Sequence, residues 1–434
     1  MARRLPLTLL GYRAFSALIT PVAPLLIAQR LRRGKENRAR VRERRGEASA
    51  SRPPGALVWL HAASVGELTS VLPLIAHLQE RNVGVLVTSG TVTSARLAEQ
   101  RLPPGVVHQF APIDTPRYVQ RFLDHWRPDL ALLVESDLWP NFIIETERRA
   151  IPMILVNARL SESSFRRWRR FPTTIGGLLE RFDLCLARTA TDRDRFAELG
   201  APRVTTTGNL KLDVPAPPTH DQEMWQLKAA IGERPIIAAA STHPGEETIL
   251  IEAYRRLRAQ HQGLLLVIAP RHPERGAGIM EIAAAAGFQS VLRSRGALPS
   301  TKTDIYIADT VGELGMIYRL APIVFIGGSL VRHGGQNPIE AAKLGAAVLH
   351  GPHVGNFTEI YAALDEAGGA RPLTDAEELV SAIATWLANP QARTKAAQTA
   401  LATVQNLGGA FERTVHALDP YLMQLRLAHQ GDHA

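Results

Sequence analysis

The stretch 56-ALVWLHAASVGEL-68 decides the fold class, because its pattern changes within a few residues. It begins with a continuous apolar run, which is typical of a parallel strand buried on both faces. Ser64 and Gly66 then mark a turn that leads into a helix. We therefore expect a strand, a tight turn and a helix, the first unit of an α/β domain, with Glu67 in the first turn of the helix.

Two interpretations of Glu67 are open. Ser64 and Glu67 fit the S-x-x-E capping box, in which the serine accepts from the N–H of residue 67 and the glutamate reaches back to the N–H of residue 64. However, residues that directly follow parallel strands lie at the ligand-binding edge of such a sheet. A carboxylate at a helix N-terminus is also favoured in its ionised form. Glu67 is thus either a cap or a base, and this stretch alone does not decide.

The alternation of apolar runs and helical stretches continues along the chain in two series. Candidate strands of the first series are 56–62, 83–89, 130–135, 153–158, 183–187 and 204–208. The segment 213-DVPAPPTH-220 follows, and its three prolines indicate a linker. Candidate strands of the second series are 235–241, 264–270, 304–309, 322–329 and 346–352. We therefore predict two doubly wound, Rossmann-like α/β domains joined by a hinge.

The positive charge of the chain is confined to its N-terminus. The whole chain has a net charge of +9, but residues 1–45 alone carry 12 lysines and arginines against 2 acidic residues. The remaining body is nearly neutral, which argues against nucleic acid as a partner. The single cysteine, Cys185, lies in an apolar run and is expected to be a core residue in a reducing compartment.

The N-terminal segment joins an apolar run to a basic one. Residues 5–28 are about long enough to cross a bilayer, which takes ~20 residues, although Arg13 and two prolines weaken a straight span. Residues 30–45 carry nine lysines and arginines, which would attract anionic lipids and keep the body on the cytoplasmic side. We expect a membrane anchor and basic linker at 1–46, either spanning or interfacial. A buried amphipathic helix with a solvated linker is the alternative.

Strand ends of the second domain are suited to a nucleotide. In 327-GGSLVRHGGQNPIEAAKLG-345, four glycines precede Asn337 and Pro338, which begin a helix whose N–H groups can bind phosphate. Glu340 could accept from ribose hydroxyls, and Arg271 could clamp a phosphate. The segment 240–247 and the turn at Gly312 are weaker candidates. For each, a simple helix cap or a solvated side chain is the alternative.

Charged side chains follow the strands of the first domain instead. Glu67, Glu135, Arg159 and Lys211 each come after a candidate strand, so they are expected to converge on one edge of the sheet. One domain suited to a nucleotide and another that presents a base and a cation are typical of a two-domain group-transfer enzyme.

Beyond these patterns, the sequence resembles the bacterial 3-deoxy-D-manno-octulosonic acid (Kdo) transferases over nearly its whole length. The motifs that carry the resemblance are HAASVGE, ESDLWPN, NARLSESS, GNLKLD, ASTHPGEE, PRHPER, DTVGELG, GGSLVRHGGQNPIEAA and GPHVGNF. The resemblance implies a GT-B fold, two Rossmann-like domains facing across a cleft, with an N-terminal membrane-anchor helix. It also implies inverting transfer of Kdo from CMP-Kdo to a lipid A precursor (lipid IVA) in lipopolysaccharide synthesis, at the cytoplasmic side of the inner membrane, without a metal or other cofactor.

Roles follow from the resemblance position by position. Glu67 matches the base that accepts a proton from the acceptor hydroxyl, and Glu135 and Lys211 match residues that support the transition state. The positions that match CMP contacts are Pro270, Arg271, Gly312, Glu313, Leu314, Asn337, Pro338, Ile339 and Glu340, to which we add Gly328 and Ser329 of the glycine-rich loop. Three departures from the family pattern are Ser136-Asp137, where Thr-Glu is usual, Gln336, where a histidine is usual, and Ala63, where a bulkier valine is usual.

These expectations define a domain plan. Residues 47–212 form the acceptor-binding domain, 213–220 the hinge and 221–434 the CMP-sugar-binding domain, whose last helix can pack back on the first domain. A GT-B transferase with a different nucleotide sugar and a membrane lipid acceptor is the main alternative, and a non-catalytic nucleotide-binding membrane scaffold is a remote one. The sequence leaves open the number of Kdo units, the acylation and phosphorylation of the acceptor, and the oligomeric state.

Overall fold

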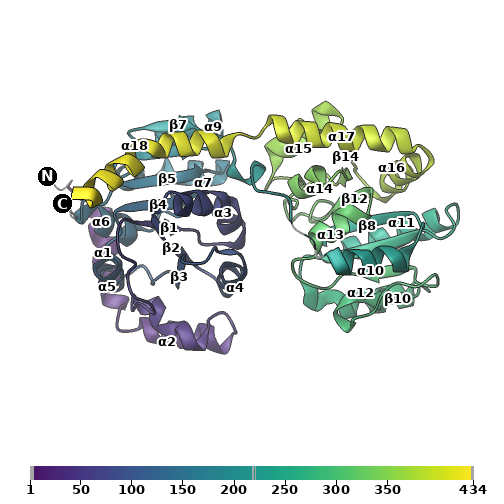
Figure 1. Ribbon diagram of the computed structural model, residues 1–434, viewed down its shortest axis with the longest axis horizontal. Coiled ribbons are helices and arrows are strands. Elements are labelled where there is room, and N and C mark those ends of the chain that lie inside the picture. Colours follow the sequence, from purple (N-terminus) through teal and green to yellow (C-terminus); the bar gives the residue numbers. More distant parts are fainter. Residues whose placement is uncertain (1–3, 218, 220, 432–434) are drawn as a thin grey trace. The chain divides into compact units, whose positions relative to one another are not determined.

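The computed structural model describes residues 4–217, 219 and 221–431, and the chain divides into two compact units (Figure 1). The first unit comprises Met1–Val214 and Gly408–Ala434, and the second Pro215–Leu407. The division falls inside the expected hinge, of which Pro218 and His220 lie outside the described residues, as do residues 1–3 of the expected anchor. We expected the second domain to run to residue 434. Instead it ends at Leu407, and the last helix, α18 (Ala410–Gly431), belongs to the first unit.

The first unit is built on a seven-stranded parallel sheet in the order β3-β2-β1-β4-β5-β6-β7. The strands are β1 (Leu57–His61), β2 (Gly84–Ser89), β3 (Val107–Phe110), β4 (Leu130–Val134), β5 (Met153–Ala158), β6 (Leu184–Ala187) and β7 (Val204–Thr206). The connecting helices are α3 (Val65–Glu80), α4 (Val92–Arg101), α5 (Pro116–Trp126), α6 (Pro140–Arg148), α7 (Glu162–Trp168), α8 (Pro172–Leu179) and α9 (Ala190–Glu198).

Both faces of this sheet are buried, which explains the continuous apolar runs. Along β1, Leu57 and Trp59 pack into one hydrophobic cluster, whereas Val58 and Leu60 pack into another. This alternation follows from the two-residue period of a strand. Cys185 on β6 is fully buried, as expected.

A second parallel sheet of seven strands, in the order β10-β11-β9-β8-β12-β13-β14, forms the second unit. The strands are β8 (Ile236–Thr242), β9 (Leu265–Pro270), β10 (Ser290–Leu292), β11 (Ile305–Ile307), β12 (Ile323–Ile326), β13 (Ala347–His350) and β14 (Ala370–Pro372). Its helices are α10 (Asp221–Ile231), α11 (Glu246–Arg258), α12 (Gly276–Ala285), α13 (Leu314–Leu320), α14 (Ile339–Lys343), α15 (Thr358–Ala367), α16 (Ala376–Ala388) and α17 (Pro390–Asn406).

All of the predicted strands form, and the predicted doubly wound architecture is confirmed in each unit. The three strands that the pattern missed are β3, β10 and β14, and each lies at an edge of its sheet. Edge strands are short and only partly covered, so they lack a continuous apolar run. The strand order reverses direction at β1 and at β8, which places the expected ligand-binding points beside those strands.

Two helices precede the first sheet, α1 (Leu7–Ile19) and α2 (Ala23–Arg32), drawn in purple in Figure 1. Among the described residues, no single helix has the length and apolarity to cross a membrane, but α1 and α2 together meet that test despite a bend of 69° between them. Leu9 is buried against the first unit, whereas Leu7, Phe15 and Leu18 are exposed. The pair thus has one face on the protein and one exposed apolar face.

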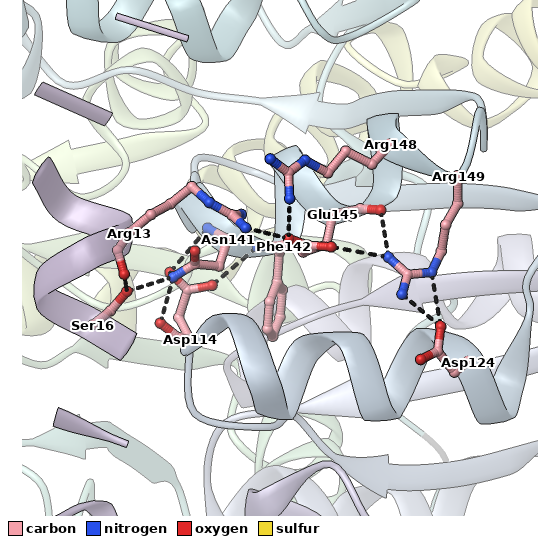
Figure 2. A network of polar contacts seen from close by, with 9 residues as sticks. All are labelled: Arg13, Ser16, Asp114, Asp124, Asn141, Phe142, Glu145, Arg148 and Arg149. Carbon is pink, nitrogen blue, oxygen red and sulfur yellow. Dashed lines mark hydrogen bonds and ion pairs between the residues drawn. The ribbon is translucent and has the colours of Figure 1, made fainter. Parts of the chain in front are cut away.

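Polar contacts hold α1 to the body of the first unit (Figure 2). Arg13 pairs with the buried Glu145 of α6 at 2.6 Å, and Asn141 donates to Ser16. Asp114 accepts from the N–H groups of Asn141 and Phe142 at the start of α6, and also from Tyr12 of α1. Arg13, the charge that weakened the segment as a membrane span, therefore serves to dock the helix.

Part of the basic run is also used inside the protein. Arg44, in the 3-10 helix Arg38–Arg45, is buried and donates to Glu36 and to the carbonyl groups of Gly90 and Ala111. Burial lowers the pKa of this guanidinium. Arg44 therefore neither fits the alternative of a solvated linker nor is exposed to attract lipid, because its charge is paired within the fold.

The Asp114→Ala variant tests how α1 and α6 are held. Removing this buried carboxylate leaves the two backbone donors of α6 and the Tyr12 hydroxyl without an acceptor, so we expect a loss of at least ~2 kcal/mol of unfolding free energy. Urea unfolding followed by tryptophan fluorescence measures it. The control Asp124→Ala removes an exposed ion pair with Arg149 and should cost under ~1 kcal/mol. Equal losses in the two variants would contradict this account.

Candidate active site

Glu67 lies at the N-terminal end of α3, directly after β1, and both of its carboxylate oxygens are engaged. Oε2 accepts from the N–H of Ala63 at 2.8 Å, and Oε1 accepts from the Ser64 hydroxyl at 2.7 Å. Ser64 caps the helix by accepting from the N–H of Glu67 at 3.3 Å. The geometry is close to the predicted capping box, but the carboxylate reaches the N–H of residue 63 rather than 64. These bonds fix the orientation of the carboxylate at the sheet edge.

The surroundings of Glu67 raise the pKa of its carboxyl above the ordinary value. Burial is the largest cause, and the negative charges of Glu135 and Asp137 add to it, against the hydrogen bonds from Ser64 and Ala63. We expected the helix N-terminus to favour the ionised form, and the net effect is the opposite. A raised pKa makes the ionised carboxylate a stronger base.

The other two predicted catalytic residues are brought to the same edge. Glu135 directly follows β4, and its Oε1 lies 2.6 Å from Nζ of Lys211. A Cβ added at Gly66, next to Glu67, would lie 4.0 Å from that Nζ. Lys211 is held by its neighbours, because Asn209 accepts from its N–H and Asn157 accepts from the N–H of Leu210. The carboxylate of Glu135 and the ammonium of Lys211 thus lie beside the candidate base. Arg159, which was also expected at this edge, follows β5 and is half-buried.

A chain of buried polar groups leads to Asp137. Trp59 Nε1 donates to Thr88 Oγ1 at 2.9 Å, and Thr88 Oγ1 lies 2.8 Å from Nδ1 of His61. The hydroxyl proton of Thr88 is then available to His61 Nδ1, which favours the tautomer with a proton on Nε2. That atom lies 3.2 Å from Asp137 Oδ2. The sequence indicated Asp137 only as a departure from the family pattern and did not indicate His61, because the contact joins two different strand ends.

In the second unit, Glu246 organises the glycine-rich loop. Its side chain is fully buried and accepts from four backbone N–H groups, those of His243, Gly328, Ser329 and Leu330, at 2.7–3.0 Å. The sequence did not single out Glu246, since two acids at a helix start also describe an ordinary first turn. The only signal was its position four residues after the end of β8.

The bonds to Glu246 limit the ligand contacts that were predicted at Gly328 and Ser329. The N–H groups of both residues already donate to Glu246, and the Ser329 hydroxyl donates to Ile326 and accepts from Gly351. Gly327 is also required by close packing, because an added Cβ would lie 2.5 Å from the carbonyl oxygen of Ser241. A ligand that used the Gly328 or Ser329 amide would have to replace a bond to Glu246.

Positively charged and imidazole groups gather at the ends of β8, β9 and β12. Arg271 follows the buried Pro270 and is exposed. The rings of His243 and His333 lie 3.7 Å apart, and those of His243 and His272 6.2 Å apart. Burial, followed by these histidines and Arg271, lowers the pKa of His243 to about 4. Gln336, which departs from the family pattern, contacts His243 at 3.0 Å. This edge is suited to an anion.

The remaining predicted donor contacts lie at two short helices of the same unit. Glu313 precedes α13, which begins at Leu314, and it pairs with Arg293 at 2.8 Å. Gly312 comes just before Glu313 and is exposed, with a positive φ of 89°. Pro338 caps α14 rather than beginning it, so this helix starts at Ile339 and has only five residues, Glu340 among them. Asn337 accepts from the N–H of Ile339.

Across the described residues, no cluster of three or more acidic, histidine or cysteine side chains could hold a metal ion.

Comparison with known proteins identifies the family. The family described as 3-deoxy-D-manno-octulosonic-acid transferase (kdotransferase) matches residues 39–214. A probable mitochondrial 3-deoxy-D-manno-octulosonic acid transferase of Arabidopsis thaliana is 37% identical over 393 residues, 88% of each chain. The chain belongs to the 3-deoxy-D-manno-octulosonic acid transferase family. Two further relatives of that name, from Haemophilus influenzae and Bordetella pertussis, are 33% and 34% identical, over 89% and 95% of this chain and 92% and 100% of their own.

The Kdo transferase family membership makes this chain a glycosyltransferase, and solved structures agree with its fold. A UDP-GlcNAc 2-epimerase from Neisseria meningitidis has a TM-score of 0.58 at 15% identity, over 83% of this chain and 99% of its own. A glycosyltransferase from Rickettsia africae has a TM-score of 0.58 at 12% identity, over 86% and 99%. The expected GT-B fold, with two Rossmann-like units, is confirmed.

The Glu246→Gln variant tests the organisation of the glycine-rich loop. An amide carries less charge and presents an NH₂ group to donors, so the bonds to residues 328–330 should weaken. We expect their backbone amides to exchange hydrogen at least about tenfold faster, since the lost bonds protect them. The control Glu252→Gln lies on the exposed face of the same helix. Unchanged exchange at 328–330 would contradict the role of Glu246.

Proposed function

We propose that this protein transfers Kdo from CMP-Kdo to a hydroxyl group of a lipid A precursor, lipid IVA, with inversion at the anomeric carbon. Family membership supports the reaction, since relatives that match most of this chain carry the name 3-deoxy-D-manno-octulosonic acid transferase. The observation that carries the mechanism is the Glu67 carboxylate, oriented by two hydrogen bonds and made more basic by burial and by the charges of Glu135 and Asp137.

The reaction is a single displacement. Glu67 takes the proton of the acceptor hydroxyl as its oxygen forms a bond to the anomeric carbon of Kdo. The bond from that carbon to the phosphate oxygen of CMP breaks on the opposite face, and its electron pair leaves with CMP. The ammonium of Lys211, held by Glu135, stabilises negative charge that develops during the displacement. No redox partner is needed, and none of these steps uses a metal.

On the donor side, the second unit binds CMP. The exposed guanidinium of Arg271 can donate two hydrogen bonds to a phosphate. Nearby, the imidazole rings of His243, His272 and His333 lie close together at the same edge. The loop that Glu246 organises, together with Asn337 and Glu340, faces the sugar and base of the nucleotide in this proposal. The other predicted contacts, Pro270, Gly312, Glu313, Leu314, Pro338 and Ile339, complete the donor site.

The enzyme works at the cytoplasmic side of the inner membrane in this proposal. The exposed apolar side chains of α1 and α2 favour contact with lipid, and the exposed basic residues that follow α2 favour anionic headgroups. Because Arg13 and Ser16 dock α1 to the protein, the helices are better suited to lie in the interface than to cross the bilayer.

Transfer from CMP-Kdo to tetra-acylated lipid A precursor, read by product mass, tests the proposal. Wild-type protein should add at least one Kdo unit, and the mass also gives their number. Glu67→Gln should slow transfer by ~10²–10⁴-fold, as for the loss of a general base, while its melting temperature stays near that of wild type. Addition of EDTA should leave the rate unchanged.

The matched control is Glu80→Gln, which changes a glutamate at the far, exposed end of the same helix. It should transfer Kdo at the wild-type rate. A folded wild-type protein that transfers sugar from UDP or ADP donors but not from CMP-Kdo would overturn the proposal in favour of another GT-B reaction. Full activity of Glu67→Gln would make Glu67 a helix cap, as the sequence pattern alone allowed.

A further inference from the structure

A cavity of about 340 Å³ lies in the first unit beside α2 and the ends of β1, β3 and β4. Leu26 and Ile27 of α2 line one side, and Ile113, Trp139 and Phe142 line others. Every lining residue falls between 26 and 142, so the cavity belongs to the first unit alone. We call it the α2 cavity.

The charged groups in the wall of the α2 cavity are already paired. Arg30 and Arg44 both contact Glu36, and Asp114 accepts from the N–H groups that begin α6. His61 lies against Asp137. Polar ligands need donors or acceptors that are not satisfied within the protein. Arg30, Arg44 and Asp114 are satisfied in this way, whereas His61 Nε2 and Asp137 Oδ2 face each other at 3.2 Å without a hydrogen bond. The surface left for a ligand is therefore mainly aliphatic and aromatic, which favours an apolar occupant.

The α2 cavity is next to the candidate base. Ala63 lines the cavity, and its N–H is the group that holds Glu67 Oε2 at 2.8 Å. Asp137 lines it too, and its charge acts on the Glu67 carboxyl. An occupant of the cavity thus lies beside the group that deprotonates the acceptor, so it belongs to the acceptor molecule rather than to the nucleotide donor.

Charge near the cavity indicates what else that molecule carries. Arg30 lines the cavity and is followed within five residues by the exposed Arg32, Arg33 and Lys35. Leu26 and Trp139 both line the cavity and are each 45% exposed, so apolar side chains extend from it to the surface. An apolar cavity beside exposed cations is complementary to an amphiphile with an anionic head.

We propose that the α2 cavity binds an acyl chain of the acceptor lipid and so positions the acceptor hydroxyl at Glu67. The inference rests on the proposed function for the identity of the acceptor. In this proposal the acyl chain contributes to acceptor recognition and does not serve as a membrane tether alone. The outer face of α2 then contacts membrane lipid, and its inner face covers the bound acyl chain.

Binding of two acceptors in detergent tests this proposal directly. The probes are the tetra-acylated lipid A precursor and the same disaccharide after removal of its acyl chains. The variant is Leu26→Trp, which fills the cavity from a half-exposed position, and the matched control is Leu25→Trp, at a neighbouring, 70% exposed position that does not line it. Leu26→Asp is the second variant in case the larger ring disturbs folding.

Wild type should bind the acylated probe at least about tenfold more tightly than the deacylated one, since several methylene groups are buried. Leu26→Trp and Leu26→Asp should remove most of that difference, and Leu25→Trp should keep it. Equal wild-type affinity for both probes would overturn the proposal, as would equal losses at positions 25 and 26, which would indicate contact with the detergent surface only. Because binding is measured without turnover, a protein that shows the acyl preference but transfers no Kdo would contradict the proposed function and leave the cavity assignment standing.

Discussion

The hydrogen bonds that hold Glu67 are the contacts on which the rest of the first unit's chemistry depends. A carboxylate that accepts from Ala63 and Ser64 cannot rotate freely, so the turn after β1 fixes the position of the group that we propose as the base. Burial and the negative charges of Glu135 and Asp137 oppose its ionisation, and Lys211 pairs with Glu135. Capping and the proposed catalysis are therefore compatible uses of this turn, because Ser64 both caps the helix and donates to the carboxylate.

Backbone strain occurs at three strand ends. Glu135, Asn157 and Ser241 all have positive φ angles, of 61°, 54° and 58°, and each comes at the end of a strand, β4, β5 or β8. For residues other than glycine such a conformation costs about 1–3 kcal/mol, and it persists only where neighbouring contacts impose it. Here those contacts are the ion pair of Glu135, the bond from Leu210 to Asn157, and the tight approach of Gly327 to Ser241. In both sheets, the backbone conformation at these strand ends therefore lowers the free energy of unfolding.

The sequence predicted the sheets better than it predicted the contacts between their ends. Central strands are buried on both faces, so their apolar runs are visible in the sequence, whereas the edge strands β3, β10 and β14 are not. Glu67, Glu135 and Lys211 could be placed on one edge because parallel strands end together. Glu246, His61 and the docking of α1 by Arg13 depend on residues far apart in the chain, so no local pattern contains them.

The pH dependence of kcat/KM for wild type and Asp137→Asn tests the central claim, that Glu67 acts as a base whose pKa is raised by burial and by its acidic neighbours. The base must be ionised, so activity falls as the pH drops through the pKa of Glu67, and the acidic limb should lie above the pH expected for an ordinary glutamate. Removing the charge of Asp137 lowers the pKa of Glu67, so the variant should remain active to a lower pH. An acidic limb at the same pH in both proteins would contradict the account.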